Sequence, residues 1–183
     1  MTDIHTLVLK SLAPELASIT TTAIRTFTEE CIKVSPAAYW LKPSAFYKGH
    51  HPTDELQEWG NLRHVKRTLV IATILAEINE LLPFDRDMLY SALVIHDIGK
   101  YGPGGDSERI LDEHPMFVPS MVATIPMSIN PQWKYEILGV VITHMGRWGK
   151  YPPVSRMEHL GHYADCIASR TTLHIRVEIK MEE

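Results

Sequence analysis

Residues 89 to 100 read Leu-Tyr-Ser-Ala-Leu-Val-Ile-His-Asp-Ile-Gly-Lys, an apolar run that ends abruptly in an imidazole and a carboxylate. Because the apolar run favours burial, we expect it to carry His96 and Asp97 into the interior with it. A buried ionised carboxylate is costly unless it is paired, hydrogen-bonded or bound to a metal. The stretch therefore predicts either a hydrogen-bonded pair in the core or part of a site for divalent Mn, Fe, Co or Zn.

The same chemistry recurs at four further positions, on segments that we expect to be separate helices. The six positions in chain order are His64, His96, Asp97, His114, His144 and Asp165. Four histidines and two aspartates are enough to enclose two metal ions that share a carboxylate. The recurrence therefore favours a metal site over a simple core pair.

This order of residues resembles the HD-domain superfamily of metal-dependent phosphohydrolases, and residues 96–100 match its HD-I-G-K variant. The resemblance covers roughly residues 62–170. It implies an all-α fold, the HD-domain helical bundle.

The resemblance also implies how the ligands divide between two divalent ions, which could be Mn, Fe, Co, Ni or Zn. The first ion would be bound by His64, His96, Asp97 and Asp165. The second ion would share Asp97 and add His114 and His144. Simpler members of the superfamily lack the last two histidines and use one metal, so the site would hold one ion if these two residues are structural or contact phosphate.

The function that the resemblance implies is hydrolysis of a phosphoester or phosphoanhydride of a nucleotide-like substrate by metal-activated water, as in a phosphodiesterase or nucleotidase. Two alternatives stay open: a di-iron oxygenase of a small hydroxylated substrate, and a non-catalytic nucleotide-binding protein. The oxygenase branch usually has a longer spacing than the 21 positions between His144 and Asp165. The branch that cleaves cyclic dinucleotides carries a His-His pair and Gly-Tyr-Pro, where this chain has Thr143-His144 and Lys150-Tyr151-Pro152.

Lys100 is the predicted catalytic partner of Asp97. It follows Asp97 by three positions at a turn marked by Gly99. Its ammonium group could contact the scissile phosphate or pair with Asp97, and we predict the phosphate contact.

Further basic and aromatic side chains are candidates for substrate binding. Arg147, Trp148 and Lys150 follow His144 in a glycine-bounded loop. The loop suits a phosphate and a flat group such as a base, unless it is only a solvated basic loop. Arg67 lies three positions after His64 on the same predicted helix face, so we expect it to point into the site.

Residues 35–61 contain three prolines and two glycines without a clear period, which predicts a long ordered loop with one short helix near residues 54–59. Its polar residues His50, His51, Asp54 and Glu55 could supply an acid or base over the site, but an ordinary polar loop is the simpler interpretation.

Apolar spacing predicts the remaining elements. Helices are expected over residues 3–30 with a break at Pro14, and over 62–82, 85–96, 113 onward, 131–145 and 155–172. Residues 173–180 alternate strictly, which predicts a short C-terminal β-strand that could pair across a homodimer. We expect a single HD domain over 1–183, in which a helix and a long loop within residues 1–61 cover the site.

Composition limits the possible partners. The 183 residues are 45% hydrophobic and 22% charged, as in soluble globular domains. The net charge of −4 argues against general affinity for nucleic acid or acidic membranes. Two cysteines are too few for a disulfide scaffold. No apolar run approaches the length of a membrane span, and residues 1–5 lack the basic and apolar regions that we would expect of a signal peptide. We therefore expect a cytoplasmic protein that binds a small phosphorylated substrate.

Overall fold

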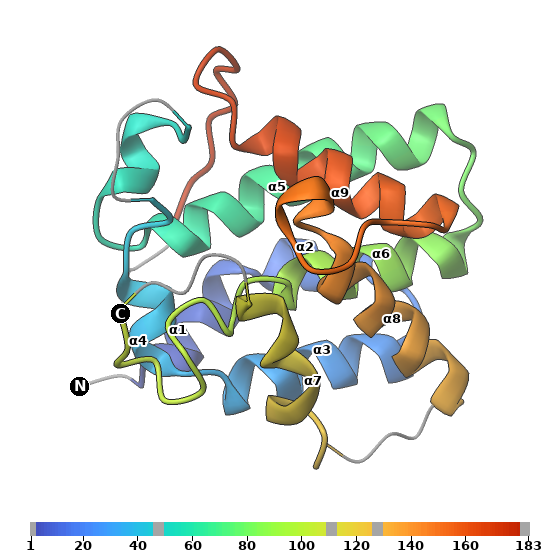
Figure 1. The fold of residues 1–183 in the computed structure, drawn as a ribbon, viewed down its shortest axis with the longest axis horizontal. Coiled ribbons are helices and arrows are strands. Elements are labelled where there is room, and N and C mark those ends of the chain that lie inside the picture. The colour runs from blue at the N-terminus through green and yellow to red at the C-terminus, as the bar shows by residue number, and fades with distance from the viewer. Residues whose placement is uncertain (1–2, 46–49, 109–112, 126–129, 180–183) are drawn as a thin grey trace.

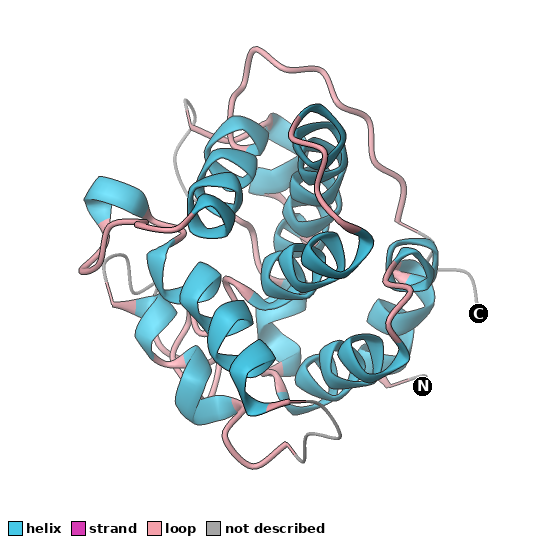
Figure 2. Ribbon diagram, turned by 90° about the vertical axis from the view of Figure 1, so that its right-hand side faces the viewer, coloured by secondary structure: helices cyan, strands magenta, loops and turns pink. Residues whose placement is uncertain are grey.

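The computed structural model describes residues 3–45, 50–108, 113–125 and 130–179, and within these ranges it contains helices and no strand (Figures 1 and 2). The predicted all-α fold is confirmed. The α-helices are α1 (Ile4–Ser11), α2 (Ala13–Ser18), α3 (Thr22–Val34), α4 (Ala37–Leu41), α5 (Gly60–Ile78), α6 (Pro83–Ile95), α7 (Val118–Met121), α8 (Pro131–Thr143) and α9 (Arg156–Ala168). Three short 3₁₀ turns join them, η1 (Thr53–Leu56), η2 (His114–Met116) and η3 (Gly146–Trp148).

Helix α6 lies at the centre of the bundle and contacts α3, α5, α8 and α9. Its residues from Asp87 to Ile95 are all buried, as expected for a helix that is apolar on every side. Pro83 in the first turn fits the start of this helix, because proline lacks the amide hydrogen that has no partner there. The helix ends directly before His96 and Asp97, and both residues are therefore buried inside the bundle.

The N-terminal segment breaks where the sequence predicted. Pro14 lies in the first turn of α2, after α1 has ended at Ser11. The threonine run separates α2 from α3: the hydroxyl of Thr20 and the amide of Thr21 donate to Oδ2 of the buried Asp87, at 2.9 and 2.7 Å. These hydrogen bonds hold the segment between α2 and α3 against α6.

The segment before α5 is more regular than expected. Helix α4 was not predicted; it forms because Tyr39 and Trp40 are buried in the core. The predicted helix near residues 54–59 is the 3₁₀ turn η1 instead. Trp59 adopts a left-handed conformation with φ of 64°, and α5 begins at the next residue.

The second half of the chain follows the predicted order with shorter elements. Where one helix was expected after Glu113, the turn η2 is followed by the single-turn helix α7, because prolines at 115 and 119 interrupt the backbone hydrogen bonds. Pro131 opens α8 as predicted. Ser155 and Glu158 form a capping box at the start of α9, which ends at Ala168 rather than near 172.

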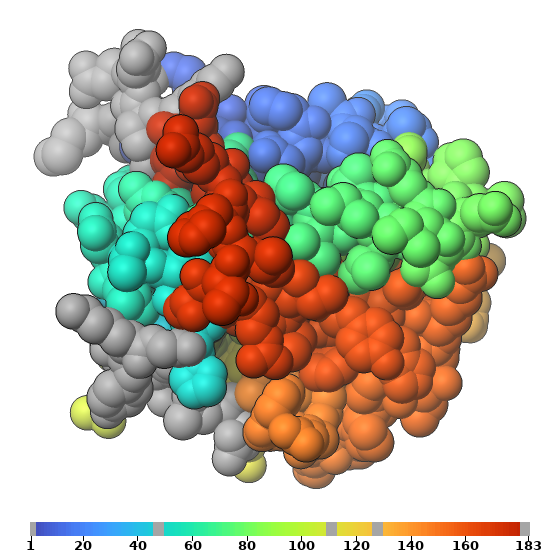
Figure 3. Space-filling view, turned by 90° about the horizontal axis from the view of Figure 1, so that it is seen from above, coloured from blue at the N-terminus to red at the C-terminus, as the bar shows by residue number. Residues whose placement is uncertain are grey.

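The predicted C-terminal strand is wrong for the described part of the tail, residues 173–179, which forms no strand. This tail lies against the surface between the segment around residues 50–60 and α5 (Figure 3). Ile175 and Ile179 pack against the core, and the carbonyl of Ile175 accepts a bond of 3.1 Å from Nε of Arg67. The alternation therefore reflects one side of an extended segment packed on its own chain.

None of the helices in the described ranges has the combination of length and apolarity that crossing a membrane requires.

Candidate metal centre

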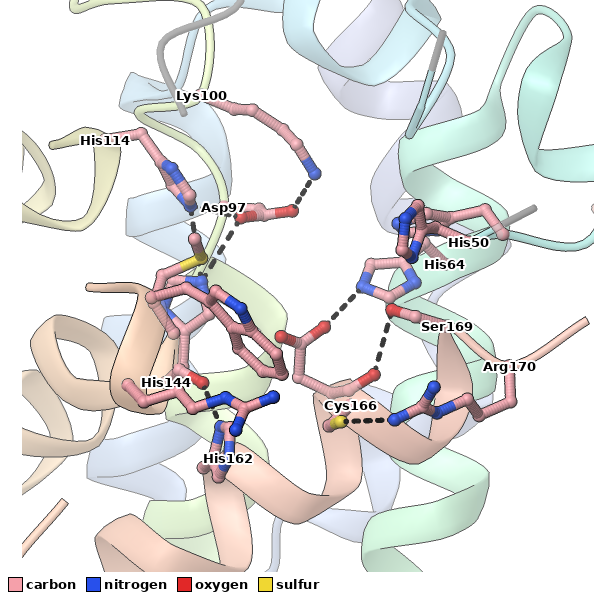
Figure 4. A pocket seen from close by; sticks show the side chains of 15 residues that line it. His50, His64, Asp97, Lys100, His114, His144, His162, Cys166, Ser169 and Arg170 are labelled. Atoms are coloured by element: carbon pink, nitrogen blue, oxygen red, sulfur yellow. Dashed lines mark hydrogen bonds and ion pairs between the residues drawn. The ribbon is translucent and has the colours of Figure 1, made fainter. Parts of the chain in front are cut away.

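The structure brings all six predicted metal ligands together. Five of them line one pocket, and His96 is buried directly beside them. They come from α5, the end of α6, η2, the end of α8, and α9. Figure 4 shows Lys100, His114 and His144 arranged around Asp97, with His64 across the pocket.

Gly99 explains how His114 reaches Asp97. A Cβ atom at position 99 would lie 2.5 Å from the carbonyl oxygen of His114, so a side chain there would push the two segments apart. Glycine lets η2 pack against the turn that follows α6. As a result, Nε2 of His114 lies 2.7 Å from Oδ1 of Asp97.

Gly146 has a similar role at the end of α8. Its φ is +59°, and an added Cβ atom would lie 2.4 Å from the ring of His162. Nδ1 of His162 hydrogen-bonds the carbonyl of His144 at 2.7 Å. This contact joins α9 to the turn after α8 and places His144 in the cluster.

Asp97 is at the centre of the cluster. Its Oδ1 atom lies 2.7 Å from Nε2 of His114 and 3.5 Å from Nε2 of His144. Its Oδ2 atom lies 2.5 Å from Nζ of Lys100 and 3.6 Å from Nε2 of His96. Three imidazoles and one ammonium group therefore surround one buried carboxylate.

Asp165 is the centre of an adjoining group. Its Oδ1 atom lies 2.9 Å from Nε2 of His64 and 3.8 Å from Nε2 of His96. Two sets of potential ligand atoms, each within 4.8 Å of one another, are His64-His96-Asp165 and His96-Asp97-His144. The first set contains three of the four ligands predicted for the first ion, whereas the second set joins His96 and Asp97 to His144 and does not include His114.

The orientations of the imidazole rings fit a divalent cation. Nδ1 of His96 donates to the carbonyl of Leu93 at 2.7 Å, and Nδ1 of His144 donates to the carbonyl of Val141 at 2.6 Å. Each ring therefore directs Nε2 toward the cluster, where Nε2 of the neutral His96 offers a lone pair. Nε2 of His96 is buried without a hydrogen-bond partner among the described residues. Leaving a buried nitrogen without a partner is energetically costly, and a metal ion bound to its lone pair would remove that cost.

The electrostatics agree with a metal-binding role. Burial lowers the pKa of His96 to about 4, so its ring is neutral at pH 7. Burial raises the pKa of Asp97, but the charge of Lys100 and the neighbouring imidazoles outweigh it and hold the pKa well below its usual value. Burial also raises the pKa of Asp165, but the hydrogen bond from His64 outweighs burial and holds this pKa below its usual value. Both acids are therefore carboxylates.

His64 has a different environment. Burial lowers its pKa, but the charge of Glu55 and the hydrogen bond to Asp165 outweigh burial and raise the pKa to about 10. At pH 7 the ring is therefore protonated on both nitrogens, with Nδ1 facing Glu55 and Nε2 facing Asp165. A metal ion bound by Nε2 would displace the proton from that nitrogen.

A second layer lies behind His64, and the sequence did not predict it. Glu55 is completely buried and contacts His51, His64 and Arg67. Arg67 was predicted to point into the site. Instead it lies outside the pocket lining, with its side chain only 3% exposed, and pairs with Glu55 and Asp54.

Some of the predicted substrate-binding residues line the cavity and others do not. Lys100, Arg147 and Trp148 line the cavity, which has a volume of about 500 Å³. Trp148 is 52% exposed, and the guanidinium of Arg147 lies 4.6 Å from its ring centre. Lys150 is not among the lining residues, and its ammonium lies 5.6 Å from the ring of Tyr151.

Four lining residues on or just after α9 were missed by the sequence analysis. They are His162, Cys166, Ser169 and Arg170. For His162 and Ser169 the available signal was their spacing of three and four positions from Asp165, which puts residues on one helix face. Cys166 and Arg170, at one and five positions from Asp165, do not have this spacing.

A family model described as HD domain matches residues 61–170, which is more than half of the chain and includes all six predicted ligands. The chain belongs to the HD domain family. This HD protein is thus a member of a superfamily of metal-dependent hydrolases that act on small molecules, and its histidine and carboxylate groups are compatible with metal binding. Comparisons with curated proteins and with solved structures gave no match.

The two cysteines of the HD protein provide a probe of the pocket. Burial raises the pKa of the Cys31 thiol far above its usual value, so Cys31 stays protonated and inaccessible. Cys166 is partly exposed and lines the cavity. We predict that iodoacetamide at pH 8 adds one group per native chain, at Cys166, and that Mn²⁺ with inorganic phosphate slows the reaction. Peptide mass mapping checks both outcomes; modification of Cys31 in the native protein would contradict the packing described here.

Proposed function

We propose that this HD protein hydrolyses a phosphoester or phosphoanhydride bond of a small nucleotide-like substrate. One observation carries the proposal: two adjacent sets of metal-ligand atoms open into a pocket whose other charged residues are cations. Among the described lining residues the acids are Asp97 and Asp165, and the cations are Lys100, Arg147 and Arg170. Such a pocket suits an anionic substrate.

The proposed ligands of the first ion are His64, His96, Asp97 and Asp165, and the second ion shares Asp97 and adds His114 and His144. Mixed imidazole and carboxylate donors suit Mn, Fe, Co, Ni or Zn. When bound, such ions supply an activated water molecule and neutralise the oxygens of a phosphoryl group. Two divalent ions against two carboxylates leave a charge of about +2, which favours binding of phosphate.

Lys100 acts on the substrate in this proposal. Its ammonium bonds Oδ2 of Asp97 in the structure, at 2.5 Å, and it also lines the cavity. A metal ion held by Asp97 would repel the ammonium and compete for the same oxygen. Lys100 would then be free to bond the nearest anion in the pocket, the phosphoryl group of the substrate.

The outer end of the pocket holds the remainder of the substrate. Trp148 offers an exposed flat surface on which a base can stack, beside the guanidinium of Arg147. Arg170 lines the pocket from the end of α9 and has no carboxylate partner among the described residues. A nucleotide supplies both the flat ring and the negative charge that these side chains can bind.

A panel of nucleotides and cyclic nucleotides, assayed by liquid chromatography with each of Mn²⁺, Co²⁺, Ni²⁺, Fe²⁺ and Zn²⁺, tests the proposed function. We expect phosphate or nucleotide release with at least one metal, and none after chelation with EDTA. Oxygen consumption by the iron-loaded protein with an organic substrate, without phosphate release, would instead identify an oxygenase. Bound metal without turnover of any compound would identify a binding protein.

The second metal position can be tested by His114→Ala and His144→Ala. Either change should lower the bound metal from about two ions per chain towards one, because the His64, His96, Asp97 and Asp165 set remains. Metal analysis after gel filtration measures the ratio, with His174→Ala, an exposed histidine outside the pocket, as the control. An unchanged ratio in both variants would mean that neither histidine is a ligand.

A further inference from the structure

Glu55 is the least expected charged residue of the structure. It lies in η1, in a segment predicted to be a polar loop, and its side chain is 0% exposed. A carboxylate can remain ionised in such a place only if charged and hydrogen-bonding partners compensate for the water it has lost. Its partners therefore indicate why it is there.

Both oxygens of Glu55 are engaged. Oε2 bonds Nδ1 of His51 at 2.7 Å and lies 3.2 Å from Nδ1 of His64. The contact with His64 is within ion-pair distance, although its orientation does not meet hydrogen-bond geometry. Oε1 is paired with the guanidinium of Arg67. One carboxylate thus joins two imidazoles that line the pocket to one buried cation.

A metal ion held by Glu55 itself is a weaker interpretation of the same cluster. The ligand atoms of His51, Glu55 and His64 do lie within 4.8 Å of one another. However, Arg67 already neutralises Glu55, and its guanidinium would repel a divalent cation placed on the same carboxylate. The arrangement fits a carboxylate that orients histidines for a site next to it.

We propose that Glu55 is a positioning residue, which accepts the Nδ1–H of His64 so that Nε2 of this ring faces Asp165 and the metal centre. Nε2 of His64 already lies 2.9 Å from Oδ1 of Asp165. Imidazole ligands commonly donate their second nitrogen to a carboxylate, which fixes the tautomer and makes the ligand nitrogen more basic. The inference rests on His64 being a ligand, as assigned in the proposed function.

The same carboxylate holds His51 at the pocket wall. Nδ1 of His51 lies 3.3 Å from Oγ of Ser44 and only 2.7 Å from Oε2 of Glu55, so the carboxylate is its closer partner. The rings of His51 and His64 are 5.0 Å apart between centres. Glu55 therefore orients two neighbouring rings together.

Arg67 completes the network from the outside. Besides Glu55 it contacts the exposed carboxylate of Asp54 at 3.0 Å and the carbonyl of Ile175 at 3.1 Å. These contacts hold the guanidinium against the buried side of Glu55. The network thus accounts for the position of Arg67 outside the pocket.

Glu55→Gln tests the proposal, because it keeps the volume and removes the charge. We expect the affinity for Mn²⁺, measured by competition with a chelator, to fall by about 10- to 100-fold. Asp54→Asn is the matched control: Asp54 pairs with the same arginine but is 44% exposed and does not touch His64, so the affinity should change less than about twofold. Equal affinities for wild type and Glu55→Gln would overturn the proposal.

A second measurement on the wild-type chain covers the case in which Glu55→Gln fails to fold. Long-range ¹H–¹⁵N NMR of the Zn²⁺-loaded protein should show His64 protonated at Nδ1 and metal-bound through Nε2. The reverse tautomer would overturn the proposal, and so would an additional bound ion that is lost in His51→Gln. Neither readout depends on turnover, so inactivity on every substrate would contradict only the proposed function.

Discussion

Replacing Asp97 by alanine is expected to abolish measurable turnover and to remove most of the bound metal. The oxygens of Asp97 lie 2.5 to 3.6 Å from Lys100 and from the Nε2 atoms of three histidines, and both proposed ions use this carboxylate. We expect turnover to fall by roughly a thousandfold or more, which exceeds the usual effect of one electrostatic contact. Metal analysis and a turnover assay measure the two losses.

The same change should lower stability. Lys100 is buried, and Asp97→Ala leaves its ammonium without the partner that it has in the structure. Removing one partner of a buried ion pair costs about 3–5 kcal/mol, and loss of metal lowers the melting temperature further. Asp85→Ala, in the first turn of α6 and therefore at the end of the helix far from Asp97, is the control and should retain metal and activity. Wild-type metal content and turnover in Asp97→Ala would refute the proposed centre.

Lys100→Met is expected to reduce turnover by roughly ten- to a thousandfold, the scale of one lost electrostatic contact in a transition state. Bound metal should be retained, because a protonated amine is no metal ligand and its removal takes a competing cation away from Asp97. Lys100→Arg should recover part of the activity, since the charge returns with a different reach.

Steady-state kinetics and metal analysis of the two Lys100 variants separate the possible roles. Lower kcat with wild-type metal content supports contact with the phosphoryl group. If Lys100→Met turns over like wild type, the residue serves only as the ion-pair partner of Asp97 seen in the structure.

Part of the cluster could be predicted because His96, Asp97 and Asp165 follow or interrupt apolar segments, whereas His64 and His114 have polar neighbours and were assigned from the resemblance to the HD superfamily. The apolar run before His96 fixes a central helix, and α6 is buried on all sides as that run requires. Asp165 lies in α9 beside the buried Ala164 and likewise has few ways to avoid the interior. A carboxylate or imidazole that its apolar neighbours carry into the interior needs a partner there, and this requirement indicates a site.

The outer layer could not be predicted because it depends on contacts between distant segments. Arg67 shares a helix face with His64, but its long side chain pairs with Glu55, twelve positions earlier. Nothing local marks Glu55 as buried, since the segment around it has no apolar period. The tail shows a related limit: alternation at residues 173–179 indicates that one side is covered, and cannot specify whether a sheet or the chain's own surface covers it.

The origin of the oxygen atom added to the product tests the central claim most directly. The Mn²⁺-loaded protein would be incubated in H₂¹⁸O, under ordinary O₂, with a nucleotide that it turns over, and the product analysed by mass spectrometry. Hydrolysis at phosphorus predicts one ¹⁸O atom on the phosphoryl group of one product for each bond cleaved. A phosphoryl group without label, together with oxygen from O₂ in an organic product of the iron-loaded protein, would contradict the proposal that this HD protein is a phosphohydrolase.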